Sequence, residues 1–73
     1  GVVLSTVWDV YKRARSYYTP HEEKLAAIRE LADMGTPEAI ECLYNIASDG
    51  YMDPPYVNEA LDMIKELKKK SKT

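Results

Sequence analysis

A seven-residue pattern occurs twice in this chain, separated by 36 residues. Residues 25–31 (LAAIREL) match residues 61–67 (LDMIKEL) at four positions, and Arg29 is replaced by another basic residue, Lys65. The same shift places Leu4 over Ile40, Val7 over Leu43, Trp8 over Tyr44 and Val10 over Ile46. Because one shift relates two separate segments to two others, we predict an internal repeat of a two-element unit.

Helix start and stop signals divide the chain into four segments. Residues 19–20 and 36–37 are both Thr-Pro, which combines a capping hydroxyl with a proline suited to the first helical turn. Residues 53–54 (Asp-Pro) open the last segment. Gly35 and Gly50 are predicted to take the left-handed conformation that ends a helix. We therefore expect helices at residues 3–17, 20–34, 37–48 and 54–70.

Apolar residues recur within each segment at helical rather than strand spacing. The predicted buried faces are Val3, Leu4, Val7, Trp8, Tyr11 and Ala14; Leu25, Ile28, Leu31 and Ala32; Ala39, Ile40, Leu43, Tyr44 and Ala47; and Val57, Ala60, Leu61, Ile64 and Leu67. The valines of the first segment also suit a strand, but the chain offers no partner strand, so we retain a helix. Short connections favour antiparallel neighbours. We predict one all-α domain, residues 1–73, of two antiparallel helical hairpins.

Two stretches carry a family likeness. Residues 34–43 (MGTPEAIECL) resemble the start of a HEAT-like repeat, and residues 58–64 (NEALDMI) resemble its second helix. Residues 2–17 and 20–34 resemble the two helices of a preceding repeat. The resemblance implies HEAT-like repeat stacking, with repeat 1 at about residues 2–34, repeat 2 at about 36–70 and a frayed tail at 71–73. A four-helix bundle is the alternative, because it buries the same apolar stripes.

The resemblance also implies an α-solenoid, and we expect this chain to be either a two-repeat unit or a piece of a longer one. Repeats of this kind bury their apolar faces against neighbours, and at least about three are needed for stability. In a longer chain, we expect an upstream repeat to pack against Val2, Val3 and Val10. The alternative is that these valines are exposed or mediate self-association.

Length and composition exclude several classes of function. No apolar run approaches the roughly 20 residues of a membrane-spanning helix, so no membrane partner is expected. The single cysteine, Cys42, forms no intrachain disulfide, which favours a reducing, cytoplasmic location. His21 and Cys42 lie on different predicted helices without a flanking motif, and they fall short of the roughly four ligands that zinc takes. Residues 49–53 offer too few oxygen ligands for calcium. We predict no enzyme, no metal and no cofactor.

The charges of the chain are distributed unevenly. Residues 19–50 contain seven acidic and two basic residues. Stacked second helices would display a ladder of carboxylates, which the resemblance places on the concave surface. We predict a protein-interaction or scaffold module that binds a basic partner segment through this face, and the alternative is a merely solvated face. The predicted partner-binding residues are Glu23, Glu30, Glu59, Asp62 and Glu66.

Nucleic-acid binding is the runner-up function, because basic residues lie beside Tyr17 and Tyr18 and a second basic group lies at the end of the chain. A sequence pI of about 5.3 counts against it. A third hypothesis is a structural piece that contacts only adjacent repeats. The candidate nucleic-acid-binding residues are Lys12, Arg13, Arg15, Lys68, Lys69 and Lys70.

Four tyrosines fall at the junctions between segments, where the hairpin geometry gathers them at one end: Tyr17, Tyr18, Tyr51 and Tyr56. We expect them to cap the core with their hydroxyl groups in water, and a recognition surface is the alternative.

Overall fold

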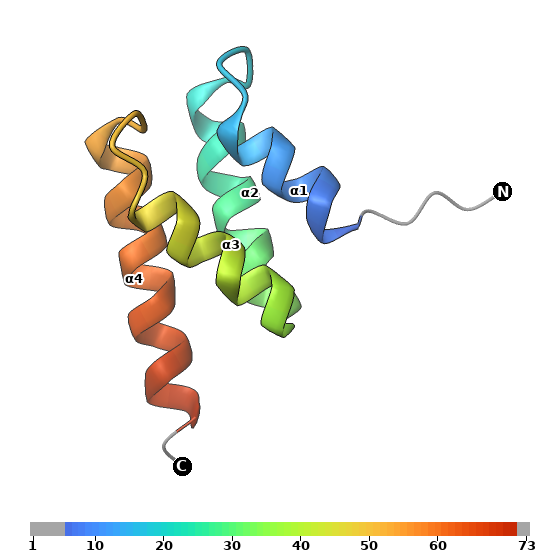
Figure 1. Cartoon of the computed structure of the whole chain (residues 1–73), viewed down its shortest axis with the longest axis vertical. Coiled ribbons are helices and arrows are strands. Elements are labelled where there is room, and N and C mark those ends of the chain that lie inside the picture. Colours follow the sequence, from blue (N-terminus) through green and yellow to red (C-terminus); the bar gives the residue numbers. More distant parts are fainter. Residues whose placement is uncertain (1–5, 72–73) are drawn as a thin grey trace, which may run out of the picture.

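The chain is all-helical in the computed structural model, which describes residues 6–71. Within this range there are four helices and no strand, so the predicted fold class is confirmed (Figure 1). The helices are α1 (Val7–Arg15), α2 (His21–Met34), α3 (Pro37–Ala47) and α4 (Pro54–Ser71). Of the tail predicted at 71–73, Ser71 is the last residue of α4, and residues 72–73 lie outside the described range.

The four helices form two hairpins that stack side by side. α1 packs on α2, α3 packs on α4, and the hairpins meet where α2 contacts α3 and α4 and where α1 contacts α3. The loops that close the two hairpins lie at the same end of the molecule, at the top of Figure 1. Over residues 6–71, no contact joins α1 to α4. An up-and-down bundle would close by packing its first helix on its last, so the arrangement here is open, with α1 and α3 in one layer and α2 and α4 in the other.

One hydrophobic core lies between these layers, and every helix contributes to it. It contains Val10, Ala14, Ala27, Ile28, Leu31, Ala39, Leu43, Ile46, Tyr56, Ala60 and Ile64. Three residues of the predicted buried faces, Trp8, Tyr44 and Leu61, are instead exposed. Val10 is fully buried within the chain, so the prediction that it receives an upstream repeat was wrong, and Val2, Val3 and Leu4 lie outside the described residues.

The repeated heptapeptide packs alike in α2 and α4 at its central isoleucine and less alike at its leucines. Ile28 and its counterpart Ile64 are both buried in the core. Leu25 is half-buried, whereas its counterpart Leu61 is 42% exposed. Leu31 is fully buried, whereas its counterpart Leu67 is half-buried. Similarity in sequence therefore carries over into packing only in part.

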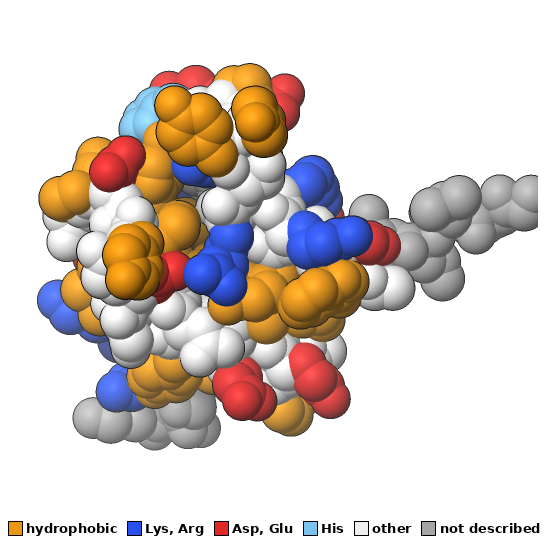
Figure 2. All heavy atoms as spheres, turned by 45° about the horizontal axis from the view of Figure 1, so that its top comes forward, with side chains coloured by type: hydrophobic (Ala, Val, Ile, Leu, Met, Phe, Trp, Pro, Cys, Tyr) orange, Lys and Arg blue, Asp and Glu red, His pale blue; other side chains and the backbone are white. Residues whose placement is uncertain are grey.

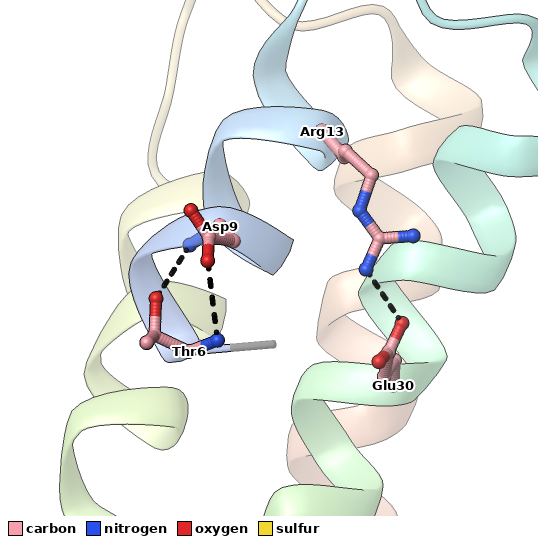
Figure 3. Close-up of polar contacts among 4 residues, drawn as sticks. All are labelled: Thr6, Asp9, Arg13 and Glu30. Atoms are coloured by element: carbon pink, nitrogen blue, oxygen red, sulfur yellow. Dashed lines mark hydrogen bonds and ion pairs between the residues drawn. The ribbon is translucent and has the colours of Figure 1, made fainter. Parts of the chain in front are cut away.

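α1 begins with a capping box that sets its start at Val7. The Thr6 hydroxyl accepts a hydrogen bond from the Asp9 backbone N–H at 3.2 Å, and the Asp9 carboxylate accepts one from the Thr6 N–H at 3.3 Å (Figure 3). The predicted start at residue 3 was wrong, because Thr6 has extended backbone geometry and satisfies the first N–H groups itself.

The other helix signals divide into confirmed and wrong predictions. Thr36 caps α3 by accepting from the Ala39 N–H at 3.2 Å, and Gly35 ends α2 with a φ of 64°. Thr19 does not cap α2, because the helix begins after Pro20 and has no side-chain cap. Gly50 is not left-handed, because α3 already ends at Ala47 and Gly50 lies in the following loop.

The capping box predicts how stability responds to acid. The hydrogen bond from the Thr6 N–H, followed by that with its hydroxyl, holds the pKa of Asp9 below its usual 3.8. Because this pKa is lower in the folded chain, the unfolded chain binds the proton of Asp9 more tightly. The stabilisation that ionised Asp9 provides is therefore fully present above pH 3.8 and is lost as the pH falls through the folded pKa. We expect Asp9→Asn to lower stability at neutral pH and to converge with the wild type in acid. Urea unfolding at several pH values measures this, and a constant difference would contradict it.

Gly35 and Gly50 provide a matched test of backbone strain. A Cβ atom meets nothing within 4 Å at either position, so only the backbone conformation distinguishes them. We expect Gly35→Ala to lower the free energy of unfolding by about 1–2 kcal/mol, because its φ lies in the left-handed region. Gly50→Ala should change it by less than about 1 kcal/mol, in either direction. Equal losses in urea unfolding of the two variants would contradict this explanation.

Candidate interaction surfaces

All three arginines of the chain are bound to its own carboxylates. Arg13 of α1 pairs with Glu30 of α2 at 3.0 Å (Figure 3). Arg29 of α2 pairs with Glu59 of α4 at 3.0 Å. Arg15 of α1 reaches Asp49 in the loop between α3 and α4 at 2.8 Å. Partly exposed pairs of this kind contribute about 0–1 kcal/mol each, and these three join elements far apart in the sequence.

The predicted acidic ladder is divided by these ion pairs. Glu30 points toward α1, where it pairs with Arg13, and Glu59 points toward α2, where it pairs with Arg29. Glu23, Asp62 and Glu66 are exposed, and none of them forms an ion pair with another described residue. The structure thus leaves three of the five predicted partner-binding carboxylates open to a partner.

The predicted basic residues are also divided. Arg13 and Arg15 are ion-paired, whereas Lys12 is exposed on α1. The lysines at positions 68–70 form the last turn of α4, where they suit the negative end of the helix dipole. The ammonium group of Lys68 lies 6.0 Å from the centre of the Tyr44 ring. Because α1 and α4 do not touch, these two groups do not form one basic surface.

His21 and Cys42 have different neighbours. The His21 Nδ1 atom lies 2.9 Å from the Tyr56 hydroxyl, and Lys24 lies 4.7 Å from the centre of the Tyr56 ring. Burial, and secondarily the charge of Glu41, raises the pKa of the Cys42 thiol, which favours its less reactive protonated form. Across residues 6–71, no cluster of His, Cys, Asp and Glu has the arrangement needed to hold a metal ion.

A groove lies between α1 and α3, and the sequence did not indicate it. It has a volume of about 430 Å³ and is lined by Thr6, Val7, Trp8 and Tyr11 on one side and by Glu38, Glu41, Cys42 and Asn45 on the other. Trp8 is 62% exposed, and Glu38 and Glu41 are also exposed. The only sequence signal was the spacing of Glu38, Glu41 and Asn45, which puts three polar residues on one side of α3.

A second hollow adjoins this groove and shares Trp8 and Tyr11 with it. Its remaining lining is basic and polar, from Lys12, Arg15 and Ser16. The two aromatic rings lie 6.0 Å apart at 54°, so they form a continuous apolar surface between the hollows. Figure 2 shows such an exposed hydrophobic area, with Lys and Arg side chains on one side of it and Asp and Glu side chains on the other.

The junction tyrosines do not behave as a group. Tyr56 is only 8% exposed and its ring packs on the core as expected, but its hydroxyl lies beside His21 Nδ1. Tyr17, Tyr18 and Tyr51 are almost fully exposed, so the prediction that they cap the core was wrong. The loops that carry them lie at the ends of the hairpins (Figure 1), whereas Tyr56 lies in the first turn of α4 and is buried.

A smaller apolar hollow of about 150 Å³ lies between α3 and α4. It is lined by Ile40, Tyr44, Ile64, Leu67 and Lys68. No residue of α1 or α2 lines it. This hollow therefore belongs to the second hairpin alone.

Comparisons with family models, with curated proteins and with solved structures found nothing that matches this chain. None of the helices in the described part of the chain combines the length and the apolar character needed to cross a membrane.

Proposed function

We propose that this chain is a non-enzymatic protein-interaction module that binds a basic segment of a partner protein. The observation that supports this best is the internal pairing of all three arginines, while many carboxylates remain exposed. A partner rich in lysine or arginine would supply the opposite charges and would associate faster because of them. The exposed carboxylates include Glu23, Glu38, Glu41, Asp62 and Glu66.

The same pairing makes a basic partner a better fit than a nucleic acid. Phosphate binding depends on Lys and Arg side chains that are free to contact the phosphates. Arg13 and Arg15 would have to exchange their carboxylate partners for phosphates, and the basic groups of α1 and α4 lie on helices that do not touch.

The test uses two fluorescein-labelled amphipathic peptides with leucines at the same positions, one with lysines and the other with glutamates elsewhere. We expect the lysine peptide to bind, with an affinity that falls as salt is added, and the glutamate peptide not to bind. The triple variant Glu23→Lys, Asp62→Lys, Glu66→Lys should weaken binding about tenfold, if each rim charge contributes roughly 0.5 kcal/mol. Glu30 and Glu59 are left intact, because reversing the charge of either would leave Arg13 or Arg29 without its carboxylate partner.

A matched variant controls for net charge. Asp33 is exposed near the end of α2 and lies outside the predicted partner-binding set. Asp33→Lys should therefore weaken binding less than any single reversal at Glu23, Asp62 or Glu66. Equal affinity for the lysine and glutamate peptides, in fluorescence anisotropy at low salt, would reject the proposal.

A second candidate function is that of a repeat unit in a longer α-solenoid. It is supported by the α3–α4 hollow and by the exposed apolar residues Tyr44 and Leu61, which a further hairpin could cover. Fusing a second copy of residues 36–71 after Ser71 tests this. A stacked third hairpin should raise the urea m-value in one cooperative transition, because more surface is buried. An unchanged m-value with rapid proteolysis of the added copy would reject it.

A further inference from the structure

The groove between α1 and α3 combines an exposed indole with carboxylates on its opposite wall. Trp8 projects from α1, while Glu38 and Glu41 line the groove from α3. Val7 and Cys42, both half-buried, add apolar surface between the two walls. An occupant of this groove therefore meets an aromatic face, an apolar floor and negative charge together.

Over residues 6–71, Trp8 differs from the other packed aromatic residues in having no lysine or arginine side chain near its ring. Tyr11, Tyr44 and Tyr56 each have one near the ring: Arg15 at 5.4 Å, Lys68 at 6.0 Å and Lys24 at 4.7 Å. Among the described residues, the only ring contact of Trp8 is that with Tyr11. Indole is the aromatic ring that attracts cations most strongly, so the most favourable ring on this surface is available to a partner.

We propose that Trp8, Glu38 and Glu41 form the seat of one lysine or arginine side chain of the partner segment. This proposal rests on the proposed function and adds a contact in the α1–α3 layer to those predicted for the carboxylates of α2 and α4. The cationic head lies over the indole and beside the two carboxylates, while its methylene stem covers Val7 and Cys42. An acidic segment would meet repulsion from Glu38 and Glu41, and a purely apolar one would bury these carboxylates without partners.

Trp8 is the only tryptophan of the chain, so its emission and its indole N–H signal report directly on this seat. We expect the lysine peptide to change the Trp8 emission as it binds. Trp8→Ala should weaken binding about thirtyfold, as removal of a central aromatic contact typically does. Glu41→Gln should weaken it as well, whereas Glu22→Gln, a neutralised carboxylate on α2, should not. Trp8 is exposed, so the fold should survive its replacement, and circular dichroism checks this.

Failure of this proposal and failure of the proposed function give different results. If the peptide binds but Trp8→Ala binds equally well and the emission stays constant, the seat is rejected and the binding function stands. If the peptide does not bind, the proposed function fails, and the seat is judged with arginine amide alone. A shift of the Trp8 indole N–H signal that is absent with uncharged citrulline amide and lost in Glu41→Gln would uphold it. No shift would overturn it.

Discussion

Replacing Leu31 with alanine is expected to lower the free energy of unfolding by about 2–5 kcal/mol. Leu31 is fully buried in the last turn of α2, in the core that all four helices share. Truncation there loses both the burial of the side chain and its contacts, because the packed helices cannot close the cavity completely. A chain of 73 residues has a total stability of about 4–11 kcal/mol, so a large share would be lost. Urea unfolding followed by circular dichroism measures the change.

Leu61→Ala is the matched control for this experiment. The same atoms are removed from a helix of the same core, but Leu61 is 42% exposed. We expect a loss below about 1 kcal/mol. If Leu61→Ala cost as much as Leu31→Ala, α4 would have to be rotated relative to the packing described above.

Replacing Tyr56 with alanine is the second large effect, with an expected loss of about 3–5 kcal/mol. The ring is buried against the core, its hydroxyl lies 2.9 Å from His21 Nδ1, and Lys24 lies near its face. Tyr56 therefore joins the start of α4 to the start of α2. Tyr56→Phe keeps the ring and removes only the hydrogen bond, so we expect a loss of about 0.5–1.5 kcal/mol.

Tyr51→Ala is the control for Tyr56→Ala, because Tyr51 is 99% exposed only five positions earlier. Its replacement should change the thermal midpoint little, since surface substitutions usually stay within about 0.5 kcal/mol. A loss at Tyr51 comparable to that at Tyr56 would indicate that the junction tyrosines form a packed cluster after all.

Local signals in the sequence predicted the helices well where they act over a single turn. Thr36 and Pro37 start α3 as expected, and Gly35 ends α2, because capping depends on three or four consecutive residues. Thr19 and Gly50 carry the same signals but lie in loops whose course is set by how the hairpins close. Thr19 donates its N–H to the Ser16 carbonyl and belongs to that turn instead.

The candidate site was largely beyond prediction, because it depends on contacts between distant residues. Helical spacing placed Trp8 on a buried face, but a nine-residue α1 buries only Val10 and Ala14 fully. Glu30 and Glu59 looked equivalent to Glu23 and Glu66, yet only the packing of α2 on its neighbours brings arginines to them. The groove exists only once α1 lies beside α3, some 30 residues later in the chain.

The absence of contact between α1 and α4 has a consequence for how binding and dynamics are linked. α1 is the shortest helix, and over the described residues it is attached only to α2, α3 and the loop that holds Asp49. Detachment of α1 should therefore require less free energy than global unfolding, and its amide protons should exchange first with deuterium. Since α1 supplies one wall of the groove, detachment would also release any occupant. By mass action, an occupant must then slow the exchange of α1 in proportion to its occupancy, whereas the exchange of α4 should respond far less.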